Sequence, residues 1–406
     1  MQEKISYTQA KEILNLQNIF PKGIERVFLH ESLNRILSQD IFAPSDMPAL
    51  NLSNMDGYAI YSVMAKNANE SFEILQENPA GNKEILELPT NKPCAIKTFT
   101  GAAIPKNADM LVPIEWVEVK DNRLIIKQIP KIGEFIRKKG DNYKKGEKLL
   151  SKGTKINSHH IGLLASLNQV FVEVYERPKV GILVNGNEIV ELGENSDLPN
   201  SIYNTNGHLL YAKILENGGI PKLYPILKDN KEQIQSCLQT ALSECDLILS
   251  TGGASVGDYD FIRQISQQQE EQVVFRGVRI KPGQHILYAH FGGKQFFGLP
   301  GFPNSTLVTF ELFAKIILVK LCGSKPHQES IQVTLDEDLQ KNDSRLEFRV
   351  CNVRNQAGIF SIDFLGKKDF QSAILNNFCP LDDSRVGLAI LENQTKKGES
   401  IEVLLL

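Results

Sequence analysis

The spacing of hydrophobic and polar residues changes several times along the chain. Residues 1–44 carry apolar residues at helical spacing in TQAKEILNLQNI and ESLNRILSQDI, which predicts two helices. Short β-rich runs such as YAIYSV and CAIKTF fill residues 45–140 and predict a small β domain. A helical pattern returns in INSHHIGLLASL. We therefore expect residues 1–44 and 141–177 to form a helical linker domain into which residues 45–140 are inserted.

A second change of pattern falls at Pro178. Buried-strand runs (KVGILVNG, PKLYPIL, DLILSTGG, QFFGLPG) alternate with amphipathic helical segments, and the last helix is expected from about residue 304 to 321. This alternation predicts a parallel α/β sheet with helices on both faces over residues 178–325. Short strands separated by turn residues follow, and they predict a C-terminal, barrel-like β domain over residues 326–406. The fold class is thus multidomain α/β plus β.

The composition favours a soluble globular protein over a nucleic-acid-binding or membrane protein. The 406 residues are 42% hydrophobic and 23% charged, which is typical of a globular, soluble protein, and the net charge of −3 lacks the basic excess of a general nucleic-acid binder. The start of the chain has no apolar signal-peptide core, and Glu311, Lys315 and Lys320 interrupt its most apolar stretch, so we expect no membrane span. Six dispersed cysteines without a CxxC pair favour reduced thiols in the cytoplasm over disulfides or zinc.

Three of the predicted strands end in segments rich in small residues. Ligands of open α/β sheets bind outside the carboxyl ends of strands, and small residues let backbone amides approach a ligand closely. The three segments are VNGNE (184–188), STGGASVGDYD (250–260) and GLPGFPNS (298–305). One such segment alone is an ordinary turn, but three of them, with Lys281 in RIKPGQH nearby in sequence, predict an oxyanion or phosphate site. Their glycine spacing matches neither a P-loop nor a dinucleotide fingerprint.

Two further motifs lie in the predicted small β domain. SNMDGYAI places Asp56 before a glycine, and FTGAAIPKNAD contains the turn Thr100–Gly101. Read alone, the first is a hairpin turn and the second a loop. The histidines at 159 and 160 begin a predicted helix, and we expect them to cap it or lie on the surface rather than bind metal.

Taken in order, these motifs resemble one protein family. SNMDGYAI (53–60), FTGAAIPKNAD (99–109), STGGASVGDYDF (250–261), KPG (281–283), GLPGFPNS (298–305) and, more weakly, EFR (347–349) resemble the molybdopterin molybdenumtransferases, bacterial relatives of the gephyrin E domain. The resemblance implies insertion of molybdate into adenylylated molybdopterin, with release of AMP and assistance from Mg²⁺. It also implies a homodimer whose active site lies between the α/β domain of one subunit and the MDGYA domain of the other. Contacts with molybdopterin adenylyltransferase and with apo-molybdoenzymes would follow, but none with nucleic acid or membranes.

The resemblance assigns roles to individual residues. The catalytic residues it implies are Asp56, Thr100, Glu188, Asp260 and Lys281. The substrate-binding residues are Gly252, Gly253, Ser255, Pro300, Gly301, Pro303, Ser305 and Arg345. The metal ligands are Glu188, Asp260 and, from the partner subunit, Asp56. These residue types suit the chemistry, because a tetrahedral dianion attracts cations, hydroxyls and backbone amides, while Mg²⁺ prefers carboxylate oxygens.

The chain departs from the family pattern at several charged positions. Asn142, Asn187 and Asn204 stand where the family has acids, and Gln284-His285 stands where it has Lys-Pro. Phe302 replaces an asparagine, and the family's serine pair near the C-terminus cannot be placed. Lys367 and Lys368 fall in that region.

An amide keeps the shape of an acid without its charge, so these changes should weaken magnesium binding. Two hypotheses stay open, an active molybdenumtransferase and a non-catalytic paralogue that binds pterin or a partner as a scaffold.

Overall fold

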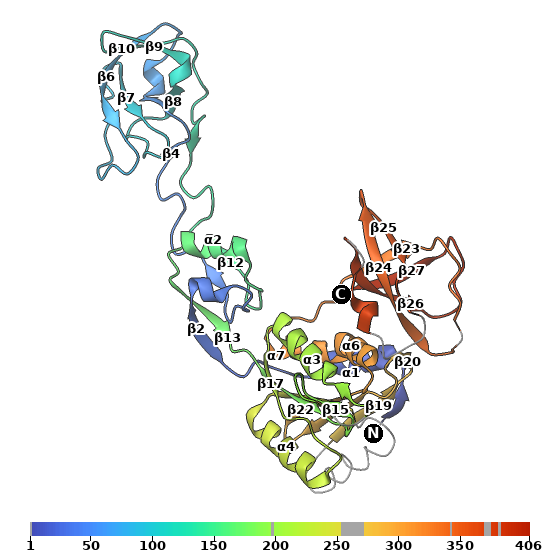
Figure 1. The fold of residues 1–406 in the computed structure, drawn as a ribbon. Coiled ribbons are helices and arrows are strands. Elements are labelled where there is room, and N and C mark those ends of the chain that lie inside the picture. Colours follow the sequence, from blue (N-terminus) through green and yellow to red (C-terminus); the bar gives the residue numbers. More distant parts are fainter. Residues whose placement is uncertain (1, 196–198, 253–271, 342, 369–374, 381–382) are drawn as a thin grey trace. The chain divides into compact units, whose positions relative to one another are not determined.

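The computed structural model describes residues 2–195, 199–252, 272–341, 343–368, 375–380 and 383–406. The chain divides into two compact units (Figure 1). The larger unit contains residues 1–39, 153–165 and 169–406, and the smaller contains residues 40–152 and 166–168. Each unit is described by itself.

A seven-stranded sheet forms the centre of the larger unit. Its order is β1 (Gln2–Ile5), β19 (Gln272–Val278), β21 (Leu287–Phe291), β22 (Lys294–Leu299), β18 (Leu247–Thr251), β14 (Lys179–Val184) and β17 (Ile220–Leu223). All strands run in one direction except β21, so the expectation of a wholly parallel sheet is wrong at this strand. Gly292 and Gly293 both have positive φ and form a tight turn, which makes β21 and β22 an antiparallel hairpin.

Helices cover both faces of this sheet, as the sequence predicts. On one face, α4 (Lys231–Glu244) packs Leu238 and Ala241 against Leu183 and Ile248. On the other face, α1 (Tyr7–Leu16), α3 (Thr205–Glu216) and the helix that begins at Pro303 contribute to one larger core. The result is the layered α/β architecture predicted from the alternation of strands and helices.

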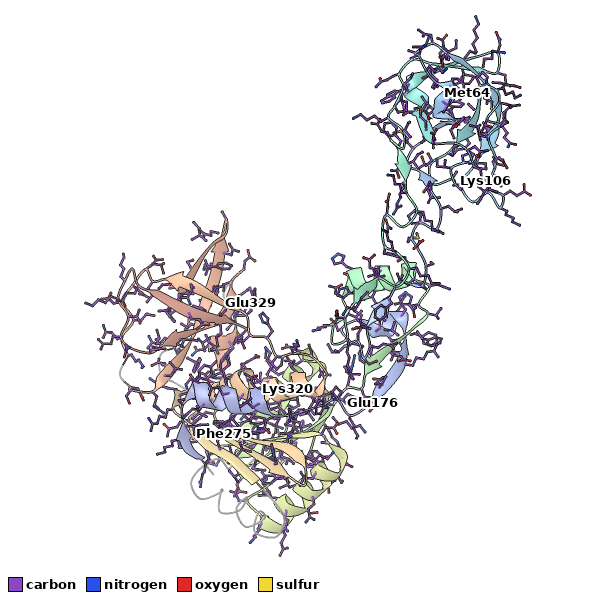
Figure 2. The ribbon with its side chains drawn as sticks, turned by 180° about the vertical axis from the view of Figure 1, so that it is seen from behind. Met64, Lys106, Glu176, Phe275, Lys320 and Glu329 are labelled. Atoms are coloured by element: carbon purple, nitrogen blue, oxygen red, sulfur yellow. The ribbon has the colours of Figure 1, made fainter. Side chains whose placement is uncertain are left out.

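The N-terminal segment belongs to this α/β core. β1 extends the sheet, and α1 begins at a capping box formed by Ser6 and Gln9 and buries Ala10 and Leu14 in the core. Lys320, labelled in Figure 2, donates hydrogen bonds to backbone carbonyls at the end of α1. The packing of residues 2–16 on the sheet is not apparent from their helical pattern alone.

The second predicted N-terminal helix, in ESLNRILSQDI, is wrong. A short 3₁₀ turn (Leu29–Ser32) is followed by Asn34 with positive φ, and Ile36 and Leu37 then pair with Lys155 and Val174. Pairing with residues far along the chain outweighs the local helical pattern. The linker region is therefore mainly β structure: β2 (Ile24–Phe28) pairs with β13 (Phe171–Tyr175), and α2 (Ser158–Ser166) is its helix. Asn157 and His160 cap α2 reciprocally.

The apolar stretch at 303–321 is a buried helix, as expected. It consists of α6 (Pro303–Thr309), a π-helical turn (Phe310–Ala314) and α7 (Lys315–Leu321). Glu311 is buried in the π turn and forms ion pairs with Lys213 (3.0 Å) and Lys315 (2.8 Å), which compensate its charge. No helix within the described ranges is both long enough and apolar enough to cross a membrane.

The smaller unit is a β domain. Its six-stranded sheet has the order β8 (Met110–Pro113), β5 (Gly57–Ile60), β7 (Cys94–Thr98), β6 (Ser71–Asn78), β10 (Arg123–Ile126) and β9 (Val117–Lys120). Shorter pairs are β4 (Leu52–Ser53) with β11 (Ile136–Arg137) and β3 (Ile41–Phe42) with β12 (Lys148–Leu150). β5 lies between β7 and β8, so the MDGYA motif leads directly into a central strand of this sheet.

The C-terminal part of the larger unit is the expected barrel-like β structure. Its sheet has the order β20 (Ile280–Lys281), β24 (Leu346–Gln356), β26 (Arg385–Leu391), β27 (Ser400–Leu405) and β23 (Ser330–Thr334), with β25 (Ile359–Asp363) also on β24. Strands β23 and β25 pack against the same core although they lie at different ends of this order, so the sheet curls around it. Phe348 and Leu388 on its other face join the α/β core.

Candidate functional site

Three strand ends of the α/β sheet meet at one crevice. The backbone N–H of Asn185, after β14, donates to the Thr251 carbonyl at the end of β18 (2.9 Å). Gly252 has φ +77° and lies so close to the Asn185 carbonyl that a side chain would overlap it. A Cβ at Gly301, after β22, would lie 3.5 Å from Cα of Gly252. The convergence of the three segments, predicted from sequence, is confirmed.

Buried oxygens without hydrogen-bond partners gather around this crevice. Among the described residues they include Oδ1 of Asn185 and Asn206 and Oγ1 of Thr251, and Oδ1 of Asn304 in the first turn of α6 is also unpaired. Asn206 comes from the start of α3, and its Nδ2 donates to the Gly301 carbonyl (2.8 Å). An unpaired buried oxygen is costly, so these atoms are suited to a ligand or metal ion. Asn206 and Asn304 were not among the predicted site residues, although Asn304 lies within the GLPGFPNS motif and Asn206 lies two residues after Asn204.

The first crevice segment contains the predicted acid Glu188 and the unusual amide Asn187. Glu188 is exposed, and its carboxylate lies against Gly186, where an added Cβ would come within 2.8 Å of it. Asn187 and Asp229 form two hydrogen bonds. Asn187 Nδ2 donates to Asp229 Oδ2 (2.7 Å), and Asn187 Oδ1 accepts from the Asp229 backbone N–H (3.1 Å). The amide at 187 therefore donates a hydrogen bond that a carboxylate could not.

Asn204 shows the same arrangement. Its Oδ1 caps α3 by accepting from Gly207 N–H (2.9 Å), and its Nδ2 donates to Glu191 Oε2 (2.9 Å). His208 Nε2 lies 2.7 Å from the other oxygen of Glu191. Burial raises the pKa of Glu191, but the hydrogen bonds from His208 and Asn204 outweigh burial and lower that pKa overall. Asn142, in the smaller unit, instead accepts from the Arg137 guanidinium.

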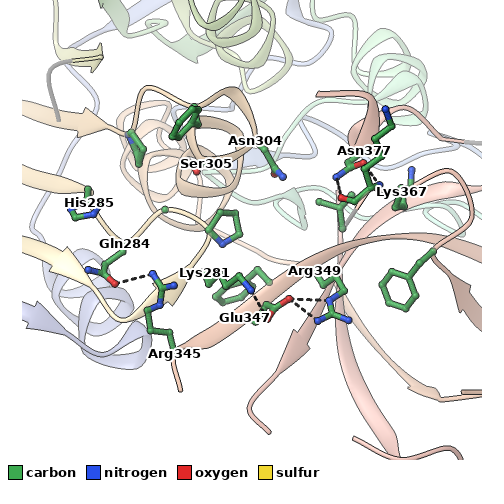
Figure 3. Close-up of a pocket in the computed structure, with 18 residues that line it drawn as sticks. Lys281, Gln284, His285, Asn304, Ser305, Arg345, Glu347, Arg349, Lys367 and Asn377 are labelled. Carbon is green, nitrogen blue, oxygen red and sulfur yellow. Dashed lines mark hydrogen bonds and ion pairs between the residues drawn. The ribbon is translucent and has the colours of Figure 1, made fainter. Parts of the chain in front are cut away.

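A cavity of ≈ 360 Å³ lies between the KPG segment, the start of α6 and the C-terminal sheet (Figure 3). Lys281 Nζ lies 3.4 Å from Oε2 of Glu347, whose side chain is only 5% exposed and which also pairs with Arg349 (2.8 Å). Gly283 has φ +100° and packs against Thr309 so tightly that a side chain there would overlap it. The loop after Lys281 is thus held against α6, with its side chains at the cavity wall.

Cations outnumber acids around this cavity. The cationic side chains in its lining are those of Lys281, Arg345, Arg349, Lys367 and Lys368. The acid in the lining is Glu347, and Asp343 pairs with Arg345 from outside the lining. The hydrogen bonds from Arg345 hold the pKa of Asp343 well below its usual range. The described lining therefore carries more positive than negative charge, which favours an anionic ligand.

The structure places the predicted residues of the larger unit at several positions. Lys281, Pro300, Ser305 and Arg345 line the cavity. Glu188, Gly252 and Gly301 lie at the crevice, while Pro303 is in the first turn of α6. Gly253, Ser255 and Asp260 lie outside the described residues.

Asp56 and Thr100 lie together in the smaller unit. The backbone N–H and the hydroxyl of Thr100 both donate to Asp56 Oδ1 (2.8 and 2.7 Å). These bonds lower the pKa of Asp56, first through the backbone N–H and then through the hydroxyl. Two motifs that are separate in sequence therefore form one exposed, ionised carboxylate of fixed orientation.

Comparison with known proteins identifies the family. Residues 5–168 match the MoeA N-terminal region (domain I and II), and residues 181–319 match a probable molybdopterin binding domain. The chain is 34% identical to a molybdopterin molybdenumtransferase of Staphylococcus epidermidis, over 83% of this chain and 81% of the relative. It is 31% identical to the Haemophilus influenzae molybdopterin molybdenumtransferase, over 96% and 98%. Its fold matches the crystal structure of a molybdopterin biosynthesis MoeA protein from Pyrococcus horikoshii with a TM-score of 0.82, at 27% identity and 99% coverage of both chains. The chain therefore belongs to the molybdopterin molybdenumtransferase family.

Proposed function

We propose that this protein is a transferase that inserts molybdate into adenylylated molybdopterin and releases AMP, giving molybdenum cofactor. Membership of the family supports the reaction class. The observation that carries the proposal is the cationic cavity, which lies beside the start of α6 in the same compact unit as the three strand ends.

The cavity suits molybdate. Molybdate is a tetrahedral dianion, and charge-assisted hydrogen bonds from cations to oxygen are among the strongest polar contacts in proteins. Lys281 lines the cavity, where it pairs with Glu347, and Ser305 lines it from the start of α6. We expect the Lys281 ammonium and the Ser305 hydroxyl, both hydrogen-bond donors, to bind the oxyanion, while the strand-end crevice takes the pterin and its phosphates.

Magnesium is the proposed cofactor, with Glu188 as a ligand. Within the described ranges, no three His, Cys, Asp or Glu side chains gather as a metal site. The unpaired oxygens of Asn185, Asn206 and Thr251 are hard donors of the kind that Mg²⁺ accepts, so the crevice fits a weakly held ion. When bound, the ion would neutralise charge that builds on the departing phosphate.

We propose further that the protein works as a cytoplasmic homodimer. Asp56 of the partner subunit would complete the metal site, and its fixed, ionised carboxylate is suited to that task. The six free cysteines fit a reducing compartment. Molybdopterin adenylyltransferase and apo-molybdoenzymes are the proposed partners before and after the reaction.

A scaffold that binds molybdopterin without turnover is the second candidate. The observation in its favour is that Asn187 and Asn204 each donate to an acid, so the crevice carries less free negative charge than a strong magnesium site needs.

The two candidates differ in AMP release. The purified protein should release AMP when incubated with adenylylated molybdopterin, molybdate and Mg²⁺. Lys281→Gln should lose this activity. Lys397 is an exposed lysine in the turn between β26 and β27, outside the cavity lining, so Lys397→Gln should keep the activity. Binding of the nucleotide substrate without AMP release would favour the scaffold, and neither binding nor release would reject both.

A further inference from the structure

The two walls of the cavity contribute positive charge unequally. On the wall formed by the KPG segment, Lys281 is followed three residues later by Gln284, which carries no charge and whose Oε1 accepts a hydrogen bond from Arg345 (2.9 Å). On the C-terminal wall, Lys367 and Lys368 stand side by side in the loop after β25. Residue 284 thus carries no positive charge, while two lysines on the C-terminal wall do.

The loop that carries these lysines is held in place. The buried Asn377 clamps it, because its Oδ1 accepts from Lys368 N–H (2.9 Å) and its Nδ2 donates to the Lys368 carbonyl (3.1 Å). Lys367 N–H closes a turn onto the Phe364 carbonyl (3.0 Å), and its ammonium donates to the Cys379 carbonyl (2.9 Å). Lys367 is therefore half-buried and oriented before any ligand arrives.

Lys367 differs from the other oriented cations of the cavity. Lys281 and Arg349 pair with Glu347, and Arg345 pairs with Asp343. The contact of the Lys367 ammonium in the described part of the chain is a neutral carbonyl, with no carboxylate at ion-pair distance. Burial lowers the pKa of Lys367, and the attraction of the more distant Asp363 offsets this lowering only in part.

We infer that Lys367 provides, from the C-terminal wall, the cationic oxyanion contact that residue 284 cannot make in this chain. The inference rests on the proposed function, because it assumes that the cavity holds a tetrahedral dianion. A second ammonium would make recognition depend on ligand charge as well as on shape. Molybdate should then be preferred over perrhenate, a monoanion of the same tetrahedral shape.

The test is calorimetric titration of the full-length protein with molybdate and with perrhenate at fixed ionic strength. Loss of a charge-assisted contact in Lys367→Gln should weaken molybdate binding about tenfold. Perrhenate binding should weaken less, so that the preference for the dianion shrinks. Lys367→Arg should retain most of the molybdate affinity, and Lys397→Gln should equal the wild type.

Lys281→Gln separates failure of this inference from failure of the proposed function. If Lys281→Gln weakens molybdate binding and Lys367→Gln does not, the inference is wrong and the proposed function stands. If both variants bind molybdate like the wild type, the cavity is not the oxyanion site and both are wrong.

A double variant tests the relocation of charge directly. Gln284→Lys should raise molybdate affinity by a larger factor in the Lys367→Gln background than in the wild type, because one ammonium would replace the other. An equal gain in both backgrounds would show that the two positions act independently, and would overturn the inference.

Discussion

The cavity and the strand-end crevice lie in the same compact unit but differ in their charged residues. In the cavity, cations exceed acids, and Lys367 has no carboxylate partner among the described residues. In the crevice, Asn187 and Asn204 stand where relatives are expected to have acids, and each donates to a nearby carboxylate. The comparison shows that the effect of a changed residue in this site depends on the residue it contacts in the fold. Where one position lacks a charge, a charged group from another segment of the chain lies close to it.

The largest expected effect comes from the shape of the crevice. Gly252→Ala would place a Cβ against the Asn185 carbonyl at positive φ, and we expect a loss of roughly 3 kcal/mol or more of unfolding free energy. Gly301→Ala is the matched control, because its Cβ would make an ordinary 3.5 Å contact. Urea unfolding measures both, and equal losses would mean that the close approach of the strand ends is unimportant.

A smaller effect is expected at the acid of the cavity. Glu347→Gln removes a buried carboxylate that pairs with Lys281 and Arg349, and we expect it to lower the unfolding free energy by about 2 kcal/mol. The same change should tighten molybdate binding several-fold, because two cations lose their competing acid. Urea unfolding and calorimetric titration measure the two effects. Weaker binding would indicate instead that Glu347 positions Lys281.

The contribution of Glu191, near the crevice, to the stability of the protein should depend on pH. The folded pKa of Glu191 is lowered, so its contribution to stability is present above its unfolded pKa of about 4.3 and is lost as the pH falls through the folded value. We expect this contribution to be less than about 1 kcal/mol, because the side chain is partly exposed. The melting temperatures of wild type and Glu191→Gln should therefore differ most above the unfolded pKa, and the difference should shrink as the pH is lowered below about 4.3. A constant difference would contradict the assignment.

The smallest effect tests the amide at 187. Asn187→Asp would put a second carboxylate beside Asp229, which raises the folded pKa of the pair, so the penalty is absent in acid and appears as the pH rises. We expect about 0.5 kcal/mol at pH 8, measured by urea unfolding, and a larger stabilisation by Mg²⁺ than in the wild type.

The matched control for the amide exchanges the two groups. Asn187→Asp combined with Asp229→Asn restores one amide and one acid, and should recover the stability of the wild type. Failure to recover it would show that the reciprocal contact is not what makes the amide favourable.

Local patterns in the sequence predicted the order of the structural parts and the convergence of the three strand ends. They failed where distant segments decide the structure. The helix predicted in ESLNRILSQDI is replaced by pairing of Ile36 and Leu37 with residues more than a hundred positions away. The dipeptide Gly292–Gly293 is a local sign of a hairpin turn. The alternation of strands and helices around it led us to expect parallel strands instead.

The partners of the unusual site residues could not be predicted in the same way. Asp229 lies 42 positions from Asn187, and nothing local to either residue indicates their contact. Lys367 was noted only as a departure from the family, because its place in the cavity depends on the pairing of β25 with β24 and on the clamp by Asn377. The residue types in the motifs indicated the kind of ligand, while the tertiary fold determined which side chains contact one another at the site.

The central claim is that the cavity between the KPG segment and the C-terminal sheet binds the oxyanion. Molybdenum scatters X-rays anomalously, so a crystal of the protein soaked in molybdate reports the position of the metal directly. The account predicts an anomalous peak in the cavity, with molybdate oxygens within hydrogen-bond distance of Lys281 and Lys367. Peaks confined to other places at saturating molybdate, with none in the cavity, would contradict it.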